Sequence, residues 1–176
     1  LETIPGKMQS PMVKWLPESL FSDPLYKNRM LLFYTGITRV AKSILADIVR
    51  GMFLNSATHL SLLEELKCHA ENTSANLSAK DFEGLARNIK KSWQLNQKLD
   101  SGTNTPEIQK LIDRIAPWSV GHKLLGAGGG GFMFIMAGDE KAANQIRHEL
   151  TTNPVNQRAR FVDFSISNTG LQVTKS

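Results

Sequence analysis

The sequence predicts an α+β fold in which an antiparallel sheet carries helices packed on one face. Three features predict this class: one apolar strand precedes several helices, two strands flank a glycine loop, and a further helix separates them from a last strand. Strands joined by a short loop pair antiparallel, and helices on one side of such a sheet give a two-layer sandwich. With 176 residues, 41% of them hydrophobic, the chain is long enough to bury a full core.

Hydrophobic spacing places the elements along the chain. Unbroken apolar runs predict buried strands at residues 30–34 and 132–137, and alternation predicts a half-buried strand at 159–166. A candidate edge strand covers residues 171–174. Apolar residues at every third or fourth position predict five helices, which cover residues 38–54, 60–70, 82–93, 106–115 and 140–150.

Polar residues before three helices predict where these helices begin. Ser78 and Asp81 resemble a capping box, Thr105 precedes a proline at the first helical position, and Asp139 precedes the last helix. The helix at 60–70 is expected to weaken after Glu71, because the apolar spacing ends there.

The chain divides into a proline-rich opening, residues 1–29, and a folded domain, residues 30–176. Four of the seven prolines lie in the opening, so we expect it to be irregular. It also carries many apolar residues, which predicts contact with another part of a longer polypeptide at an interdomain region. The first residue is Leu1 rather than methionine, and we expect the chain to be a piece of such a polypeptide.

Composition excludes several classes of protein. A lone Cys68 excludes a disulfide framework and a cysteine zinc site, and it suits a reducing, cytoplasmic compartment. The four histidines lack metal-ligand spacing, so no metal site is expected, and the apolar stretches are too short for a membrane span. The basic residues behind the net charge of +5 are scattered, so we expect no nucleic-acid site.

The segment between residues 126 and 131 holds five of the 13 glycines. Gly126, Gly128 and Gly131 match G-x-G-x-x-G, but a strand follows where a dinucleotide site needs a helix N-terminus. Phe132 stands where a P-loop needs lysine. Two interpretations remain: a wide hairpin turn, or a loop whose backbone lies against a phosphate or against a second, phosphate-holding loop.

Residues 123–132, Lys-Leu-Leu-Gly-Ala-Gly-Gly-Gly-Gly-Phe, resemble the third conserved motif of the GHMP kinases. The segment 99–106 before it also fits this family. Residues 32–39 and 158–163 look like the C-terminal part of bacterial L-fucose kinases, which often form the second half of bifunctional fucokinase/fucose-1-phosphate guanylyltransferases. The resemblance covers nearly the whole chain and implies a ferredoxin-like two-layer sandwich.

The resemblance implies the C-terminal domain of an ATP-dependent sugar kinase that phosphorylates an anomeric hydroxyl, converting L-fucose to L-fucose 1-phosphate. ATP and Mg²⁺ would bind the full-length enzyme. The family's P-x-x-x-G-L-G-S-S-A triphosphate motif does not occur in these 176 residues. We therefore expect no catalytic residue here, no activity of the chain alone, and an N-terminal kinase domain of the same polypeptide as its partner.

The resemblance also implies binding residues. Nucleotide contacts are expected from the loop, Gly126, Ala127, Gly128, Gly129, Gly130 and Gly131, and sugar contacts from Thr35, Gly36, Ser101 and Thr103. A D-glycero-D-manno-heptose 7-phosphate kinase is an alternative, because that family has a similar segment around Tyr34-Thr35-Gly36. The sequence is also compatible with a non-enzymatic ligand-binding module or a dimerisation domain, and a homo-oligomer is a candidate assembly.

Overall fold

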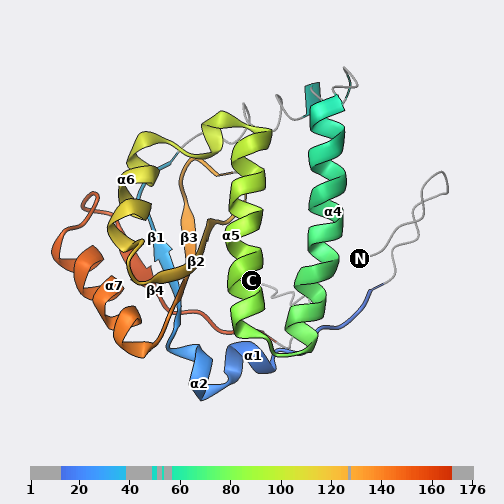
Figure 1. Ribbon diagram of the computed structural model, residues 1–176. Helices are drawn as coiled ribbons and strands as arrows, with labels where there is room; N and C mark the ends of the chain where they lie inside the picture. The colour runs from blue at the N-terminus through green and yellow to red at the C-terminus, as the bar shows by residue number, and fades with distance from the viewer. Residues whose placement is uncertain (1–12, 39–48, 51–52, 54–56, 127, 168–176) are drawn as a thin grey trace, which may run out of the picture.

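The computed structural model describes residues 13–38, 49–50, 53, 57–126 and 128–167 (Figure 1). The expected helix at 38–54 falls mostly outside these residues, and the expected strand at 171–174 falls entirely outside them. No helix of the described part is both long enough and apolar enough to cross a membrane. The elements are α1 (Ser19–Ser22), α2 (Pro24–Lys27), β1 (Met30–Tyr34), α4 (Ala57–Ser78), α5 (Phe82–Leu99), the 3₁₀ turn η1 (Ser101–Thr103), α6 (Pro106–Ile115), β2 (Ser119–Leu124), β3 (Phe132–Ala137), α7 (Glu140–Thr152) and β4 (Arg160–Val162).

The four strands of the described residues form one antiparallel sheet in the order β2-β3-β1-β4. β1 and β3 lie at its centre, where Phe33 is opposite Met133 and Tyr34 is opposite Phe132. This strand order, with helices between β1 and β2 and between β3 and β4, is the ferredoxin-like arrangement. The predicted α+β class with an antiparallel sheet is therefore confirmed.

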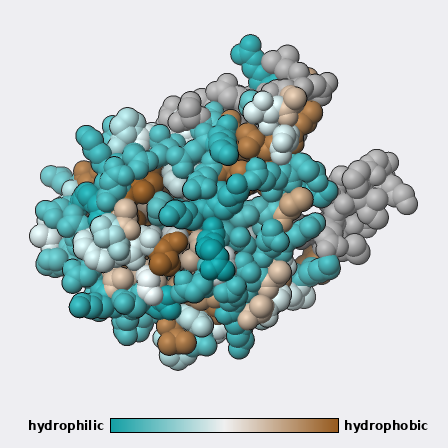
Figure 2. Space-filling model, viewed as in Figure 1, coloured by the Kyte–Doolittle hydropathy of each residue, from teal (hydrophilic) through white to brown (hydrophobic). Residues whose placement is uncertain are grey.

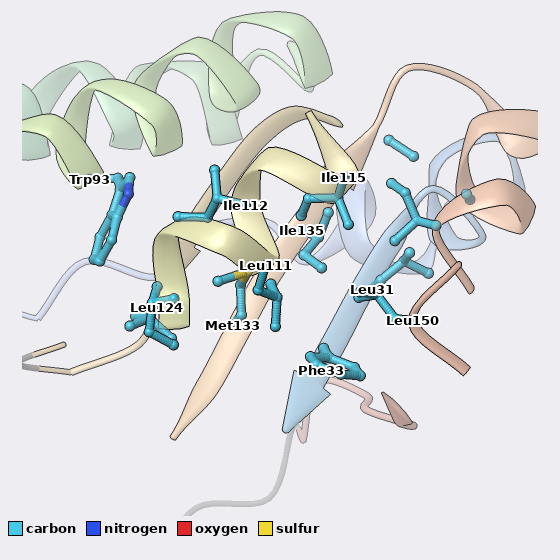
Figure 3. Close-up of a cluster of buried hydrophobic side chains, with 14 residues drawn as sticks. Leu31, Phe33, Trp93, Leu111, Ile112, Ile115, Leu124, Met133, Ile135 and Leu150 are labelled. Carbon is cyan, nitrogen blue, oxygen red and sulfur yellow. The ribbon is translucent and has the colours of Figure 1, made fainter. Parts of the chain in front are cut away.

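The main core fills the space between the sheet and the layer of α6 and α7 (Figures 1 and 3). Leu31 and Phe33 of β1 and Met133 and Ile135 of β3 point to this side, as alternation along a strand requires. They meet Trp93 of α5 and buried side chains of α6 and α7. The apolar positions of α6 and α7 recur at helical spacing: Ile108, Leu111, Ile112, Ile115, Ala143, Ile146 and Leu150.

Residues of α1 and α5 also cover the opposite face of the sheet, whereas the sequence predicted helices on one face. Here the alternate residues of β1 and β3, such as Met30 and Met136, pack with Leu20 of α1 and Phe82 at the start of α5. Leu20 is 0% exposed, so part of the proline-rich opening packs into this second cluster. Both faces of the central strands are buried, which explains why the two strand segments read as unbroken apolar runs.

The end of α4 and the capping box expected before α5 differ from the prediction. α4 does not weaken after Glu71 but continues to Ser78, because it packs along α5 (Figure 1). The buried His69 places Nε2 2.6 Å from the carbonyl oxygen of Asn88 on that neighbour. Ser78 ends α4 and does not cap α5; Asp81 alone caps it by accepting from the Gly84 amide.

The caps expected at Thr105 and Asp139 are confirmed, because each side chain accepts a hydrogen bond from the third amide of its helix. β4 is shorter than the expected 159–166 strand, and its partner among the described strands is β1. Chain direction places the end of β1, the end of β2, and the starts of β3 and β4 at one edge of the sheet. The glycine loop lies at this edge.

Candidate functional site

The glycine loop is the connection between β2 and β3. A hydrogen bond from the Leu125 amide to the Phe132 carbonyl, 2.8 Å long, closes the hairpin at its base. All five loop glycines have positive φ, from +75° to +155°, a conformation that side chains with a Cβ rarely adopt. Ala127 lies outside the described residues. This backbone path therefore requires glycine at these positions. The two or three loop residues of an ordinary hairpin would not all have to be glycine.

One side of the loop is fastened to the segment that follows β1. The Thr35 amide and the Thr35 hydroxyl both donate to the Gly131 carbonyl oxygen, at 2.9 Å each. The Gly131 amide donates in return to the Ile37 carbonyl oxygen at 2.9 Å. At Gly130 the backbones approach so closely that a Cβ would collide with that same carbonyl oxygen. Both backbone groups of Gly131 are thus fixed by residues 35–37.

The other side of the loop is fastened to η1. The Gly129 amide donates to the Thr103 carbonyl oxygen at 2.7 Å. A Cβ on Gly128 would lie 2.5 Å from Thr103 Cγ2 and 2.8 Å from the Thr103 carbonyl oxygen, so no side chain fits there. The carboxylate of Asp100 holds the turn itself by accepting from the Gly102 amide at 2.6 Å. The loop is therefore clamped between two segments that are distant in sequence.

The turn after β1 has its own support from the connection between α7 and β4. Gly36 has φ +68°, and a Cβ there would collide with the side-chain oxygen of Asn156. The Asn156 amide nitrogen donates to the Thr35 carbonyl oxygen at 2.8 Å. Sequence reasoning missed Asn156, because no local pattern links it to a turn 121 positions away.

Apolar and aromatic side chains flank the loop. Leu125 and Phe132 are 47% and 40% exposed, although they are large hydrophobic residues. Phe132 contacts Tyr34 across the strands, with ring centroids 5.1 Å apart, and the Arg160 guanidinium lies 5.0 Å from the Tyr34 ring centre. On the face drawn in Figure 2, hydrophobic residues form small separate patches among hydrophilic ones.

Burial lowers the pKa values of two basic side chains on β2. Burial lowers the pKa of Lys123, whose ammonium donates to Ser92 Oγ at 2.6 Å. Burial, with a smaller contribution from the positive charge of Lys90, lowers the pKa of His122 to about 4, so this imidazole is neutral at pH 7. Among the described residues, no three His, Cys, Asp or Glu side chains gather in a group that could hold a metal ion.

The structure brings the expected site residues to one edge of the sheet. Thr35 and Gly36 lie on one side of the loop, while Ser101 begins and Thr103 ends the turn on its other side. Thr35 and Thr103 are buried, with 0% and 1% exposure, and the Thr35 hydroxyl is engaged with the loop backbone. Their contact with a sugar, and contact of the loop with a nucleotide, stay predictions.

Comparison with known proteins finds a family match that includes the glycine loop. Residues 73–156 match the family model described as GHMP kinases C terminal. L-fucokinase/L-fucose-1-P guanylyltransferase of Bacteroides fragilis is 49% identical over all 176 residues, which are 18% of its length. Bifunctional fucokinase/GDP-fucose pyrophosphorylase of Arabidopsis thaliana is 30% identical over 70% of this chain and 12% of its own length.

A solved structure shows the same fold. The crystal structure of L. major mevalonate kinase in complex with R-mevalonate superposes with a TM-score of 0.64 at 18% identity, covering 78% of this chain and 41% of that one. The fold, the glycine loop and the family match together define the class as the C-terminal domain of a GHMP kinase. The chain belongs to the GHMP kinases. Within them it is similar to the fucokinases named above, of whose length it spans less than a fifth.

Proposed function

We propose that this chain is the C-terminal domain of an ATP-dependent kinase that transfers the γ-phosphoryl group to the anomeric hydroxyl of L-fucose. The observation that carries the proposal is the glycine loop, whose five positive-φ residues are clamped on both sides at the sheet edge. A loop without side chains lets another backbone or a phosphate approach closely. The 49% identity to the Bacteroides fucokinase supports L-fucose as the acceptor.

In this proposal the loop acts as one wall of the reaction cleft. Phosphoryl transfer requires positioning and charge neutralisation more than covalent help from the protein. Gly128 to Gly131 supply position, because their backbone is fixed by hydrogen bonds to residues 35–37 and to Thr103. The family's triphosphate motif does not occur in these 176 residues, so the proposal assigns the contacts of that motif, and Mg²⁺, to the rest of the enzyme, while the loop lies against the nucleotide from the other side of the cleft.

The same proposal gives a role to the exposed apolar residues beside the loop. Leu125 and Phe132, which flank the loop, are 47% and 40% exposed. Exposed large hydrophobic residues that gather near a functional loop often mark an interface. We assign this surface to contact with the remainder of the polypeptide, which the relatives possess beyond the matched region.

The test is an assay of the full-length protein that contains this chain. With ATP and Mg²⁺ we expect consumption of ATP that depends on L-fucose, and a product whose phosphorus signal couples to the anomeric proton. D-glycero-D-manno-heptose 7-phosphate is the comparison acceptor, and the 176-residue chain alone is expected to be inactive. A clear preference for the heptose 7-phosphate would overturn the choice of acceptor. Absence of ATP turnover with either sugar would favour a non-enzymatic binding module.

A further inference from the structure

The side chain of Asn156 links two segments that are far apart in the sequence, and the proposed reaction assigns it no role. It lies in the connection between α7 and β4 and is half-buried. Its Nδ2 donates to the Thr35 carbonyl oxygen at 2.8 Å, and its Oδ1 accepts from the Arg158 amide at 2.9 Å. A donor and an acceptor on opposite sides require an amide group here, because a carboxylate cannot donate.

The turn that Asn156 contacts is shaped around this side chain. Gly36 is buried with φ +68°, and any Cβ at this position would collide with the Asn156 amide group. The turn and the asparagine therefore fit each other closely.

The same turn, residues 35–37, is hydrogen-bonded to one side of the glycine loop. The Thr35 amide and hydroxyl donate to the Gly131 carbonyl oxygen, and the Ile37 carbonyl oxygen accepts from the Gly131 amide. Thr35 Oγ1 also accepts from the Ile37 amide at 3.2 Å, so the two residues that hold Gly131 are hydrogen-bonded to each other. The Thr35 carbonyl, which Asn156 contacts, therefore belongs to the same hydrogen-bonded turn that fixes Gly131.

We propose that Asn156 is a positioning residue that fixes the glycine loop through the turn at residues 35–37. The proposal rests on the kinase function proposed above. The side-chain hydrogen bonds of Asn156 go to Thr35 and Arg158, not to Gly131, so it acts on the loop through Thr35. Removing it leaves the Thr35 carbonyl without that donor and frees the turn to shift, and displacements of about 1 Å near a reacting group can cost on the order of 10²-fold in rate.

The experiment uses Asn156→Asp in the full-length protein. The carboxylate can still accept from the Arg158 amide but faces the Thr35 carbonyl with a negative charge in place of a donor. We expect kcat to fall by about tenfold or more, with a smaller change in KM for both substrates. Hydrogen exchange of the peptide 125–132, measured without ligand, should become faster. The exposed neighbour Gln157→Ala is the matched control and should behave as wild type.

Each outcome decides the proposal. Wild-type kcat together with wild-type exchange in the loop would overturn it. Exchange that rises equally throughout the domain would also overturn it, because that result indicates a general structural role. Asn156→Ala adds no charge and repeats both measurements if the aspartate variant does not fold. If the wild-type protein shows no kinase activity, the proposed function fails, and the exchange of residues 125–132 alone decides the positioning role.

Discussion

Gly128→Ala should destabilise the domain clearly more than Gly126→Ala, although both changes add one methyl group to the same loop. The two glycines have similar φ values of +94° and +79°. An alanine at positive φ therefore costs about 1–2 kcal/mol at either position. The surroundings differ: a Cβ on Gly126 has nothing within 4 Å, whereas a Cβ on Gly128 lies 2.5 Å from Thr103 Cγ2.

The size of the difference follows from the contact. Carbon atoms normally pack about 3.5–4.0 Å apart, so the loop or the turn must shift by roughly 1 Å. Thr103 is 1% exposed, and its carbonyl oxygen is only 2.8 Å from the added carbon, so moving one side chain does not relieve the clash. Overpacking of this kind costs about 1–3 kcal/mol. We expect Gly128→Ala to be less stable than Gly126→Ala by about 2 kcal/mol.

Urea unfolding of the chain measures this difference through the midpoint at constant m-value. In thermal melts the two variants should differ by about 4–8 °C, since about 2–4 °C corresponds to 1 kcal/mol at this chain length. Adding Thr103→Ser to Gly128→Ala removes Cγ2 and should recover part of the loss, whereas Thr103→Ser with Gly126→Ala should not. Equal stability of the two single variants would refute the clamped geometry of the loop.

Three further outcomes are expected in the same unfolding assay. The pKa of His122 is about 4 in the folded state and 6.5 when unfolded, so protonation favours the unfolded state between these pH values. The free energy of unfolding should therefore fall by up to about 3 kcal/mol as the pH falls from about 6.5 toward 4, and His122→Gln should flatten this part of the stability curve. Thr35→Val should cost about 1–3 kcal/mol, because the buried hydroxyl donates to the loop, and Thr35→Ser should retain most of the stability. Gly121→Ala should cost about 1–3 kcal/mol, since its Cβ would lie 2.6 Å from the Ala86 carbonyl oxygen of α5, while Gly138→Ala, with 3.6 Å to its nearest neighbour, should be nearly neutral by comparison.

Local patterns were sufficient for the parts of the fold that local physics determines. The strands at 30–34 and 132–137 are buried on both faces, so their apolar runs identified them without any knowledge of partners. Thr105 and Asp139 were recognised as N-caps because a cap depends only on the next three residues. The glycine density likewise predicted a special backbone path, which the positive φ values confirm.

Features that depend on tertiary contacts could not be predicted in this way. The second half of α4 has a weak apolar pattern and is helical because it packs on α5, through contacts such as that of His69 Nε2 with the Asn88 carbonyl oxygen, 2.6 Å apart. The support of Gly131 by Thr35, and of Thr35 by Asn156, joins segments about 100 positions apart. Such contacts leave no periodic signal in a single sequence.

The central claim, that the glycine loop forms one wall of a nucleotide and sugar cleft, is tested most directly by hydrogen exchange of the full-length protein. Exchange of residues 125–132 is compared without ligand and with Mg²⁺, a non-hydrolysable ATP analogue and L-fucose. We predict slower exchange in this loop when the ligands are bound, and little change at the opposite edge of the sheet, in residues 138–145. A separate binding measurement establishes the concentrations at which both ligands saturate the protein. Unchanged exchange in the loop at those concentrations would contradict the claim.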